Sequence, residues 1–398
     1  MKCVIEKLDY EGRGLCHVDG KVVFASNTLP EEVVELEIEK QEKNYDIAKV
    51  VSFYQKSEHR LPSFCPHASI CGGCRFSCVS YAKSLEYKKE IIKDLFSKNG
   101  FDIPDFFIEA SRPVLEYRNK VSLKVQDYQY GYYQEETHQF VPIKKCFLLN
   151  PSIQKLLDDF SLFSFQNGNL IIKTNQSNEL LLDIETEEEL KIKEELVLKH
   201  SIKGIIWNGS CVYGQSFLEE KRSDIIYQIP AQSFFQINPY ISEKIQEKVN
   251  SLFDENDEVY DLYCGVGFFS LRLARKVKNV IGIELSLQSI LGAKANAMKN
   301  HIENVSFHVG KVEDILPKLK HKCNKVIVDP PRSGLKKSVI NALLEEELDL
   351  ICYISCNPIT LVRDLKLLTE KYQMKFIQGY DMFSYTKHTE CLCVLEKK

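Results

Sequence analysis

The chain has 398 residues, of which 44 % are hydrophobic and 27 % charged, and its formal net charge is −4. This length exceeds one comfortable hydrophobic core, so we expect a soluble protein of two or three domains. No apolar run approaches the length of a membrane span, and any contact with nucleic acid must use a local basic surface. Glu6 stands where a signal peptide has its apolar core, so we expect a cytoplasmic protein with no membrane partner.

Residues 1–56 read as a small β module. Alternating segments at residues 2–8, 20–25, 32–39 and 45–53 are separated by turn signals such as Asp19-Gly20. About five short strands in this length are typical of an OB-like barrel, a scaffold that often binds nucleic acid. A purely structural barrel fits the pattern equally well.

Residues 57–225 form the second expected part, an α+β central domain. An amphipathic stretch at residues 81–98 predicts a helix that can pack on the C-terminal part of the chain. Strand-like pieces follow at residues 120–125 and 128–133. The acidic run at residues 185–189 is interpreted as the solvated start of a helix.

From residue 226 onward, short apolar strands alternate with helical stretches. This alternation predicts a doubly wound parallel sheet, so the fold class is α/β with a Rossmann-like domain at residues 226–398. The expected strands are residues 258–263, 280–284, 305–309, 325–328 and 350–355.

A glycine-containing turn, Asp261-Leu262-Tyr263-Cys264-Gly265-Val266-Gly267, follows the first of these strands. Glycines there let the backbone approach a ligand at the carboxyl end of the sheet, and Glu284 ends the next strand, where it can bind ribose hydroxyls. A nicotinamide dinucleotide is the alternative cofactor. The glycine fingerprint for that cofactor has a third glycine, which this sequence lacks. Phe268 and Phe269 stand where the pyrophosphate-binding turn would continue. S-adenosylmethionine fits better.

Two further motifs end strands on the same rim. Asp329-Pro330-Pro331-Arg332 closes the fourth strand, and Ser355-Cys356-Asn357-Pro358 follows the fifth, which places the Cys356 thiol for reaction. A thiolate that adds to carbon 6 of uracil makes carbon 5 nucleophilic, and a base must then remove the carbon-5 proton. Glu390, just before an apolar strand at residues 391–395, is the candidate base. Taken alone, it is also compatible with an exposed structural glutamate.

Together these segments resemble the motifs of the RNA uracil-5 methyltransferases. The resemblance includes Phe234-Phe235-Gln236-Ile237-Asn238 and residues 381–390, in the same order and spacing as in that family. It implies methylation of carbon 5 of a uridine, with Cys356 as nucleophile and Glu390 as general base. It also implies an S-adenosylmethionine site with contacts from Gln236, Tyr263, Glu284 and Asp329. Gly265 is expected at the same site because it belongs to the glycine-containing turn.

Two positions depart from the family pattern. Phe268 replaces a small or amide residue, so no cofactor contact is expected from it. Ser384-Tyr385 replaces the usual Pro-His pair, so the role of that histidine is not carried over, although His388 remains close by.

Fourteen cysteines are many for a cytoplasmic chain. Cys65, Cys71 and Cys74, with the distant Cys146, give four thiolates, enough for a tetrahedral zinc site or an iron–sulfur cluster, and Cys78 is a rival fourth ligand on spacing. The members of the family that act on ribosomal RNA carry this arrangement and a [4Fe–4S] cluster, which implies Cys146. Methyl transfer needs no electrons, so a structural role is expected. Buried, inert thiols are expected at Cys16, Cys211, Cys264, Cys323, Cys391 and Cys393.

RNA recognition is expected from the first two parts of the chain. Residues 1–56 resemble the TRAM domain, and Tyr117-Arg118-Asn119-Lys120 resembles a stretch of the family's central region, which implies RNA contacts by Arg118 and Lys120. A solvated strand edge is the alternative. The barrel and the cysteine set favour 23S ribosomal RNA as substrate, with transfer RNA as runner-up, and the uridine must be flipped from its stack.

Some alternatives stay open. A methyltransferase acting on an exocyclic amine would need no nucleophile, and a non-catalytic RNA-binding protein would need no cofactor. We expect a monomer that does not act on DNA.

Overall fold

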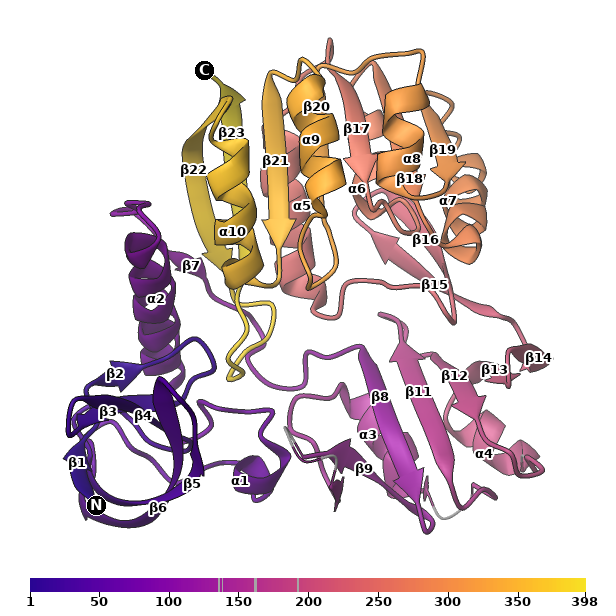
Figure 1. Cartoon of the computed structure of the whole chain (residues 1–398). Helices are drawn as coiled ribbons and strands as arrows, with labels where there is room; N and C mark the ends of the chain where they lie inside the picture. The colour runs from indigo at the N-terminus through magenta and orange to yellow at the C-terminus, as the bar shows by residue number, and fades with distance from the viewer. Residues whose placement is uncertain (135–136, 138, 161–162, 192) are drawn as a thin grey trace.

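The computed structural model describes residues 1–134, 137, 139–160, 163–191 and 193–398. Figure 1 shows a β-barrel at the N-terminus, a second sheet formed by the middle of the chain, and a larger α/β sheet that ends at the C-terminus. Within the described residues, no helix has both the length and the hydrophobicity of a membrane span.

The N-terminal strands form one curled sheet in the order β1-β5-β6-β4-β3-β2. The strand expected at residues 2–8 is divided in two. The Ile5 amide donates to the Glu32 carbonyl and the Glu6 amide to Leu15, so the chain changes partner there and joins the two ends of the sheet. The strands are β1 (Lys2–Val4), β2 (Lys7–Leu8), β3 (Gly14–Val18), β4 (Lys21–Ala25), β5 (Val33–Gln41) and β6 (Tyr45–Gln55).

Helix α2 links the barrel to the C-terminal sheet. It spans Tyr81–Lys98, as the sequence predicted, and begins where the Ser80 side chain accepts a hydrogen bond from the Lys83 amide. Ile92 and Phe96 of this helix belong to the core of the C-terminal part. The short helix α1 (Ala68–Cys71) precedes it, and β7 (Ile108–Glu109) follows it and pairs with the edge of the C-terminal sheet.

The central sheet has the order β10-β9-β8-β11-β12-β13-β14, and α3 (Pro151–Asp158) and α4 (Glu194–Lys199) pack on it. The helix expected to start in the acidic run at residues 185–189 is wrong, because β12 ends at Glu185 and α4 begins at Glu194. The strands are β8 (Lys120–Gln126), β9 (Gln129–Tyr133), β10 (Phe140–Pro142), β11 (Gly168–Thr174), β12 (Leu180–Glu185), β13 (Ile202–Trp207) and β14 (Ser210–Gly214).

Glu188 explains part of that acidic run. Its carboxylate accepts hydrogen bonds from the backbone amides of Gln166 and Asn167, so it satisfies a turn and does not begin a helix. Cys211, expected to be buried, is exposed on β14, whereas the other scattered thiols named above are buried. Beyond β14, a hairpin of β15 (Phe217–Arg222) and β16 (Ile225–Pro230) leads into the C-terminal part.

The C-terminal sheet has the order β19-β18-β17-β20-β21-β23-β22-β7. Strands β17 to β21 are parallel, as predicted, but β23 lies antiparallel between β21 and β22, so the sheet is mixed. A short hairpin-like return from β22 to β23 explains this, because a parallel return would need a crossover connection. The strands are β17 (Glu258–Leu262), β18 (Asn279–Glu284), β19 (Val305–Val309), β20 (Lys325–Val328), β21 (Leu350–Ser355), β22 (Tyr372–Tyr380) and β23 (Glu390–Lys397).

Helices cover both faces of this sheet (Figure 1), and each face has its own hydrophobic core. One core includes residues of α5, α6 and α7, and the other includes residues of α2, α8, α9 and α10. The helices are α5 (Pro239–Ser251), α6 (Phe268–Ala274), α7 (Leu287–Lys299), α8 (Val312–Ile315), α9 (Lys337–Glu345) and α10 (Pro358–Leu368), with a 3-10 turn at Leu316–Lys318. The strands are thereby held rigidly, with their carboxyl ends at one edge.

Candidate active site

The carboxyl ends of β17, β18 and β20 bring three of the predicted cofactor-binding segments together. The Tyr263 amide donates to the Ile283 carbonyl at 2.8 Å, and the Asp329 amide donates to Leu262 at 3.3 Å. Glu284 is the last residue of β18. Because these loops leave adjacent parallel strands, Tyr263, Glu284 and Asp329 lie at one edge of the sheet, where open α/β sheets bind ligands in a crevice.

The backbone at Gly265 borders this crevice without a side chain. Its φ is +54°, in the left-handed region, and a Cβ placed on it would meet no atom within 4 Å, so the backbone borders open space. Its amide donates to a Glu284 carboxylate oxygen at 3.3 Å, while the Ser286 amide donates to the other at 2.8 Å. The carboxylate is therefore held beside that space, as the binding of a ribose diol requires.

A second group of carboxyls lies below the crevice. Asp261 is fully buried, and burial raises its pKa to about 7; one of its oxygens accepts from Ser270, and the other has no hydrogen-bond partner in the described chain. Burial also raises the pKa of Asp329, with a further contribution from the charge of Asp261. Gln236 reaches Asp329 through its side-chain amide at 3.5 Å. The crevice floor is thus acidic and suits a positively charged ligand.

Phe268, the departure from the family pattern, does not face this crevice. Its ring packs in the hydrophobic core at 5.5 Å from that of Phe235, in an edge-to-face arrangement, and only 6 % of the residue is exposed. Phe234, in contrast, is 59 % exposed beside Gln236, so the motif offers one aromatic ring to the core and one to solvent.

Cys356 and Glu390 come from neighbouring antiparallel strands. Ser355 at the end of β21 is paired with Cys391 on β23, so Cys356 directly follows one member of this pair and Glu390 directly precedes the other; the charge of Glu390 also acts on the Cys356 thiol. On its other side, Glu390 is paired with Tyr380 of β22. The predicted nucleophile and the predicted base are therefore brought together by sheet pairing, although 34 positions separate them in the sequence.

The surroundings of this pair favour its uncharged forms. The pKa of the Cys356 thiol is raised to about 12, chiefly by burial and then by the charges of Glu390 and Asp329, while the charge of Arg332 acts in the opposite direction. Burial raises the pKa of Glu390 as well, followed by the charge of Asp329, and again Arg332 opposes the shift. Perturbed groups of this kind in a crevice are typical of functional sites.

Arg332 is a functional residue that the sequence arguments did not single out, although it closes the quoted Asp-Pro-Pro-Arg motif. Its side chain contacts the His388 Nε2 atom at 3.0 Å. Burial, followed by the positive charge of Arg332, lowers the pKa of His388 to about 3, so the imidazole is neutral and accepts this hydrogen bond. The Asn357 side chain donates to the Arg332 carbonyl at 3.0 Å and ties the two motifs together.

The N-terminal barrel reaches this site through the turn between β2 and β3. Glu11 forms an ion pair with Lys387, next to His388. Tyr10 packs against the apolar cluster that includes Phe76 and Tyr385. Burial raises the pKa of Tyr10, with contributions from the charges of Cys391, Glu11 and Cys356, so its hydroxyl lies near the predicted nucleophile. No local sequence signal identified Tyr10.

The four cysteines proposed as metal ligands lie near one another. Burial raises the pKa of Cys65, and so do the charges of Cys146 and Cys71. Burial raises that of Cys74 to about 12, with contributions from Cys146, Cys65 and Cys71. Among the described residues, no three His, Cys, Asp or Glu side chains are close enough to hold a single metal ion. The set is therefore looser than a preformed zinc site.

Cys78 lies elsewhere. Burial raises its pKa and the charge of Glu32 raises it as well, whereas the charge of Arg60 and a hydrogen bond with Arg60 lower it. Arg60 and Glu32 form an ion pair at the barrel. The structure thus groups Cys146, and not Cys78, with the other three thiols.

The segment at residues 117–120 joins the central sheet to the C-terminal part. Asn119 donates from its side chain to the Gln236 carbonyl at 3.0 Å and from its amide to Ile237 at 3.1 Å. Arg118 lies beside Cys74 and Cys146, and its Nε atom is buried with no hydrogen-bond partner in the described residues. Lys120 is half-buried and lines a pocket with Lys173. Neither cation projects freely into solvent.

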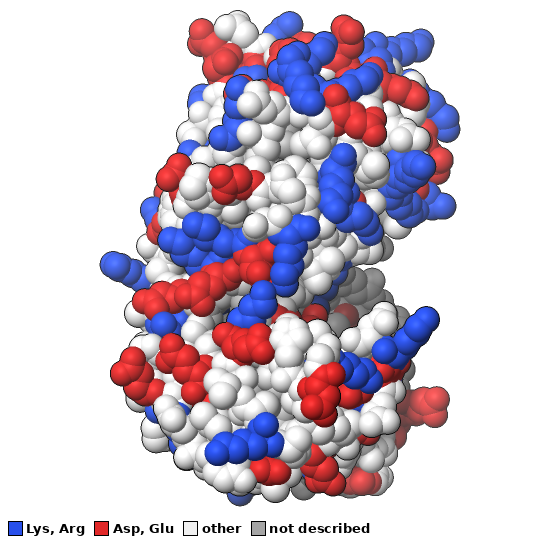
Figure 2. Space-filling view, turned by 60° about the vertical axis from the view of Figure 1, so that its left-hand side comes forward, with Lys and Arg blue, Asp and Glu red and all other residues white. Residues whose placement is uncertain are grey.

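Surface charge is mixed on the face that carries the barrel and α2. Figure 2 shows Lys and Arg side chains interspersed with Asp and Glu over this face. The arrangement agrees with the net charge of −4. Recognition of an RNA on this face must therefore combine phosphate contacts with shape and stacking.

Comparison with known proteins agrees with the site. The sequence profile described as tRNA (uracil-5-)-methyltransferase matches residues 172–398. A Caldanaerobacter subterraneus protein named "uncharacterized RNA methyltransferase" is 33 % identical over 439 residues, which covers 99 % of this chain and 97 % of that protein. A Listeria monocytogenes protein of the same description is 31 % identical and covers 99 % and 96 % of the two chains.

A solved structure has the same overall fold. It is the Pyrococcus abyssi tRNA (uracil-54, C5)-methyltransferase in complex with S-adenosyl-L-homocysteine. The TM-score is 0.79 with 24 % sequence identity, and the alignment covers 99 % of this chain and 100 % of the other. The likeness extends over all three parts of the molecule.

Proposed function

This chain belongs to the tRNA (uracil-5-)-methyltransferase family of RNA methyltransferases, and we propose that it methylates carbon 5 of one uridine through a covalent bond between Cys356 and carbon 6. The observation that supports the covalent mechanism is the pairing of Ser355 with Cys391, because Cys356 and Glu390 are the next residues beyond that pair on the two chains and Glu390 acts on the pKa of Cys356. Both lie at the crevice edge with Asp329, whose charge affects each of them. A nucleophile, a base and a cofactor crevice are thus in one place.

The proposed reaction assigns each group one task. The Cys356 thiol gives its proton to solvent and the thiolate sulfur adds to carbon 6, which leaves an enolate whose carbon 5 is nucleophilic. S-adenosylmethionine supplies the electrophilic methyl group. Glu390 then takes the carbon-5 proton, the electrons of that C–H bond form the C5–C6 double bond, and the carbon–sulfur bond breaks to release Cys356 as thiolate. Arg332 stabilises the anionic forms of both residues, which their burial disfavours.

The cofactor-binding residues are assigned the binding and orientation of S-adenosylmethionine. Glu284 accepts hydrogen bonds from a ribose diol beside the open space at Gly265, and Tyr263 borders the same space. Asp329 and Gln236, which contact each other, would help to hold the cofactor, and the ionised form of Asp329 would attract its sulfonium group. This division of tasks follows the crevice geometry and the charges described above.

We propose that Cys65, Cys71, Cys74 and Cys146 hold a [4Fe–4S] cluster. The proposal is supported by the mutual effect of these thiols on their pKa values, which indicates that they lie near one another, and four thiolates are the ligand set of such a cluster. The unpartnered Nε–H of Arg118 is available as a donor to cluster sulfide. The cluster would fix the fold between the barrel and the central sheet, and Arg118 would then support it.

The proposed substrate is 23S ribosomal RNA, and transfer RNA is the second candidate. The TRAM-like barrel together with four cysteines is the arrangement of the family members that act on ribosomal RNA. Transfer RNA is favoured by the similar Pyrococcus abyssi enzyme, which acts on it. Tyr10 and the exposed Phe234 are the aromatic rings available for stacking on a flipped base or its neighbour. Lys120 remains a candidate phosphate contact.

The test uses total RNA from a strain that lacks the protein. The purified enzyme and S-adenosylmethionine are added, and 5-methyluridine is mapped in 23S ribosomal RNA and transfer RNA. The wild type and Cys211→Ala, a variant of an exposed thiol on β14, are expected to form it, while Cys356→Ala is not. Activity of Cys356→Ala on an exocyclic amine would instead identify the other methyltransferase class. Failure to bind S-adenosylmethionine in calorimetry would indicate a non-catalytic RNA-binding protein.

A further inference from the structure

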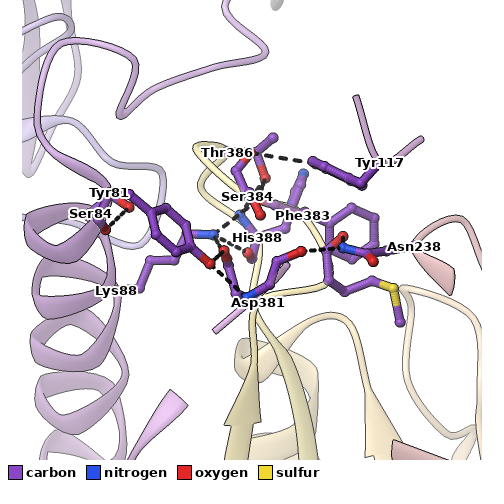
Figure 3. Close-up of polar contacts among 12 residues, drawn as sticks. Tyr81, Ser84, Lys88, Tyr117, Asn238, Asp381, Phe383, Ser384, Thr386 and His388 are labelled. Atoms are coloured by element: carbon purple, nitrogen blue, oxygen red, sulfur yellow. Dashed lines mark hydrogen bonds and ion pairs between the residues drawn. The ribbon is translucent and has the colours of Figure 1, made fainter. Parts of the chain in front are cut away.

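Lys88 is a lysine whose side chain is completely buried. It lies on the face of α2 that packs against the C-terminal part, one or two turns along from Tyr81 and Ser84, which share that face. Its ammonium group donates to Asp381 Oδ1 at 2.5 Å, to the Phe383 carbonyl at 3.0 Å and to the His388 carbonyl at 2.9 Å (Figure 3). An ammonium group has three hydrogens, so each of them is used.

All three acceptors lie in the loop at residues 381–389, which connects β22 to β23. Asp381 directly follows β22, and His388 comes two residues before Glu390, the first residue of β23. One ammonium group therefore binds both ends of the loop and closes it. Bringing the two ends of a loop together costs conformational entropy, and the hydrogen bonds of Lys88 offset part of that cost.

Asp381 is held from a second direction. The Tyr81 hydroxyl donates to Asp381 Oδ2 at 2.6 Å and accepts from the Ser111 amide at 2.7 Å, as Figure 3 shows for the tyrosine and the aspartate. Asn238 also donates to Ser111 Oγ and to the Met382 carbonyl. The loop is thus fixed by α2, by the segment after β7 and by the Gln236 motif, none of which contains a predicted catalytic residue.

The loop determines where two groups of the site lie. Glu390 is buried, and the charge of Asp329 contributes to raising its pKa, so the two carboxyls lie close together. His388 both accepts from Lys88 through its carbonyl and contacts Arg332 through its ring. Loosening the loop would therefore displace the base and release the arginine.

We propose that Lys88 is a positioning residue for the proton-abstraction step, which it serves by closing the loop that places Glu390. The proposal rests on the function proposed above. Displacement of a catalytic group by about 1 Å can lower a rate by about 100-fold. Addition of Cys356 and methyl transfer do not require Glu390, so only the final step should slow, and the methylated RNA should remain bound through the carbon–sulfur bond.

The test measures this bound species directly. Wild type, Lys88→Met, Tyr81→Phe and Glu390→Gln are incubated with substrate RNA and S-adenosylmethionine that carries a radioactive methyl group. The fraction of label that migrates with protein in a denaturing gel is compared with kcat. Lys89→Met is the matched control, because Lys89 is the next residue of the same helix and is exposed. Binding of S-adenosylmethionine and thermal unfolding are measured in parallel.

For Lys88→Met we expect kcat to fall by about 10- to 100-fold while the protein-bound fraction rises several-fold and cofactor affinity stays the same. Tyr81→Phe should show a smaller change in the same direction, and it decides the question if Lys88→Met does not fold. The proposal is overturned if kcat and the bound fraction fall together, or if both stay at the level of Lys89→Met. If Glu390→Gln itself retains no RNA, the assignment of the base is wrong instead.

Discussion

Cys356 and Glu390 flank the last pair of β21 and β23, Ser355 with Cys391, and the charge of Glu390 acts on the Cys356 thiol. This relationship depends on β23 running antiparallel to β21, because a parallel strand would present its other end at the crevice. Because the two side chains come from different segments of the chain, each can be replaced while the other is kept.

Replacement of Glu390 by glutamine should trap the reaction after methyl transfer. The amide cannot accept the carbon-5 proton, so the bond from Cys356 to carbon 6 persists. A denaturant-resistant adduct of protein and RNA is expected to accumulate with Glu390→Gln, and turnover should fall by about 10²- to 10⁴-fold. The double variant Cys356→Ala/Glu390→Gln is the control. An adduct that survives in the double variant would rule out Cys356 as the attachment point.

Replacement of Arg332 by glutamine should shift the pH dependence of the reaction. Burial raises the pKa of Cys356 to about 12 and the charge of Arg332 lowers it, so removal of that charge raises the pKa further. The thiolate fraction at neutral pH then falls by about tenfold for each unit of increase. Because the rate rises with pH below the pKa of the thiol, the variant should regain activity as the pH is raised.

Arg332→Lys provides the matched control, since it retains the positive charge but not the planar donor group that contacts His388. We expect single-turnover rates of the lysine variant to follow the pH profile of the wild type, with the glutamine profile displaced upward in pH. A glutamine variant whose Cys356 thiol is alkylated at the wild-type rate at each pH, but which methylates RNA more slowly, would assign Arg332 a purely structural part.

Replacement of Asp261 by asparagine should stabilise the free enzyme above neutral pH. Burial raises the pKa of Asp261 to about 7, whereas an unfolded aspartate titrates near pH 4. Between these values the unfolded state loses its proton and the folded state keeps it, so the free energy of unfolding falls as pH rises through this window. The loss amounts to at most about 4 kcal/mol. Asparagine does not incur it and can still accept from Ser270.

Thermal unfolding of the cofactor-free protein between pH 4.5 and 8 measures this effect. Asp261→Asn should melt at a higher temperature than the wild type at pH 8, and the difference should shrink toward pH 4.5. The exposed Asp105 supplies a control, since Asp105→Asn should show no such pH dependence. A variant that is destabilised equally at every pH would contradict the role of burial.

Replacement of Tyr10 by alanine should weaken RNA binding without affecting the cofactor. The ring lies near Cys356 but is carried by the barrel, outside the crevice at Gly265 and Glu284. Stacking of an aromatic ring on a base contributes about 1–3 kcal/mol, so KM for RNA should rise by about 5- to 100-fold. Tyr10→Phe should retain most of the affinity. A change in S-adenosylmethionine affinity of similar size would argue for a general disturbance of the site.

The sequence allowed good prediction of the elements that local pattern determines. Helix α2 and strands β19, β20 and β21 have the predicted bounds, because amphipathic period and short apolar runs are properties of a few adjacent residues. The motifs at their ends then placed Asp329 and Cys356 on one rim, since parallel strands share an edge. Sheet topology and these motifs were sufficient to find the crevice.

Other features depend on residues far apart in the chain. The ion pair of Lys88 with Asp381 and that of Glu11 with Lys387 each join segments separated by nearly 300 positions or more, and no local period encodes them. The antiparallel direction of β23 is set by a short return from β22, which periodicity does not show. Arg118 read as an RNA contact because it is a cation beside a tyrosine, and only the packing places it against Cys74 and Cys146.

The cysteine assignment gives a prediction in which two similar changes should have different effects. Cys146 is near Cys65 and Cys74, whereas Cys78 is hydrogen-bonded to Arg60 at the barrel. We therefore expect Cys146→Ser to lose iron and visible absorbance when the protein is prepared without oxygen, and Cys78→Ser to keep both. Serine preserves side-chain size but is a poor ligand for iron, so the change tests ligation with little effect on packing.

Iron, sulfide and zinc analysis of the same preparations separates the remaining possibilities. A wild type with zinc, no sulfide and no visible absorbance would replace the cluster by a zinc site on the same thiols. Loss of iron from Cys78→Ser but not from Cys146→Ser would reverse the choice of the fourth ligand. Because the cluster is assigned no electron-transfer role, chemical reduction of the holoprotein should leave the methylation rate unchanged, whereas removal of the metal should lower the melting temperature.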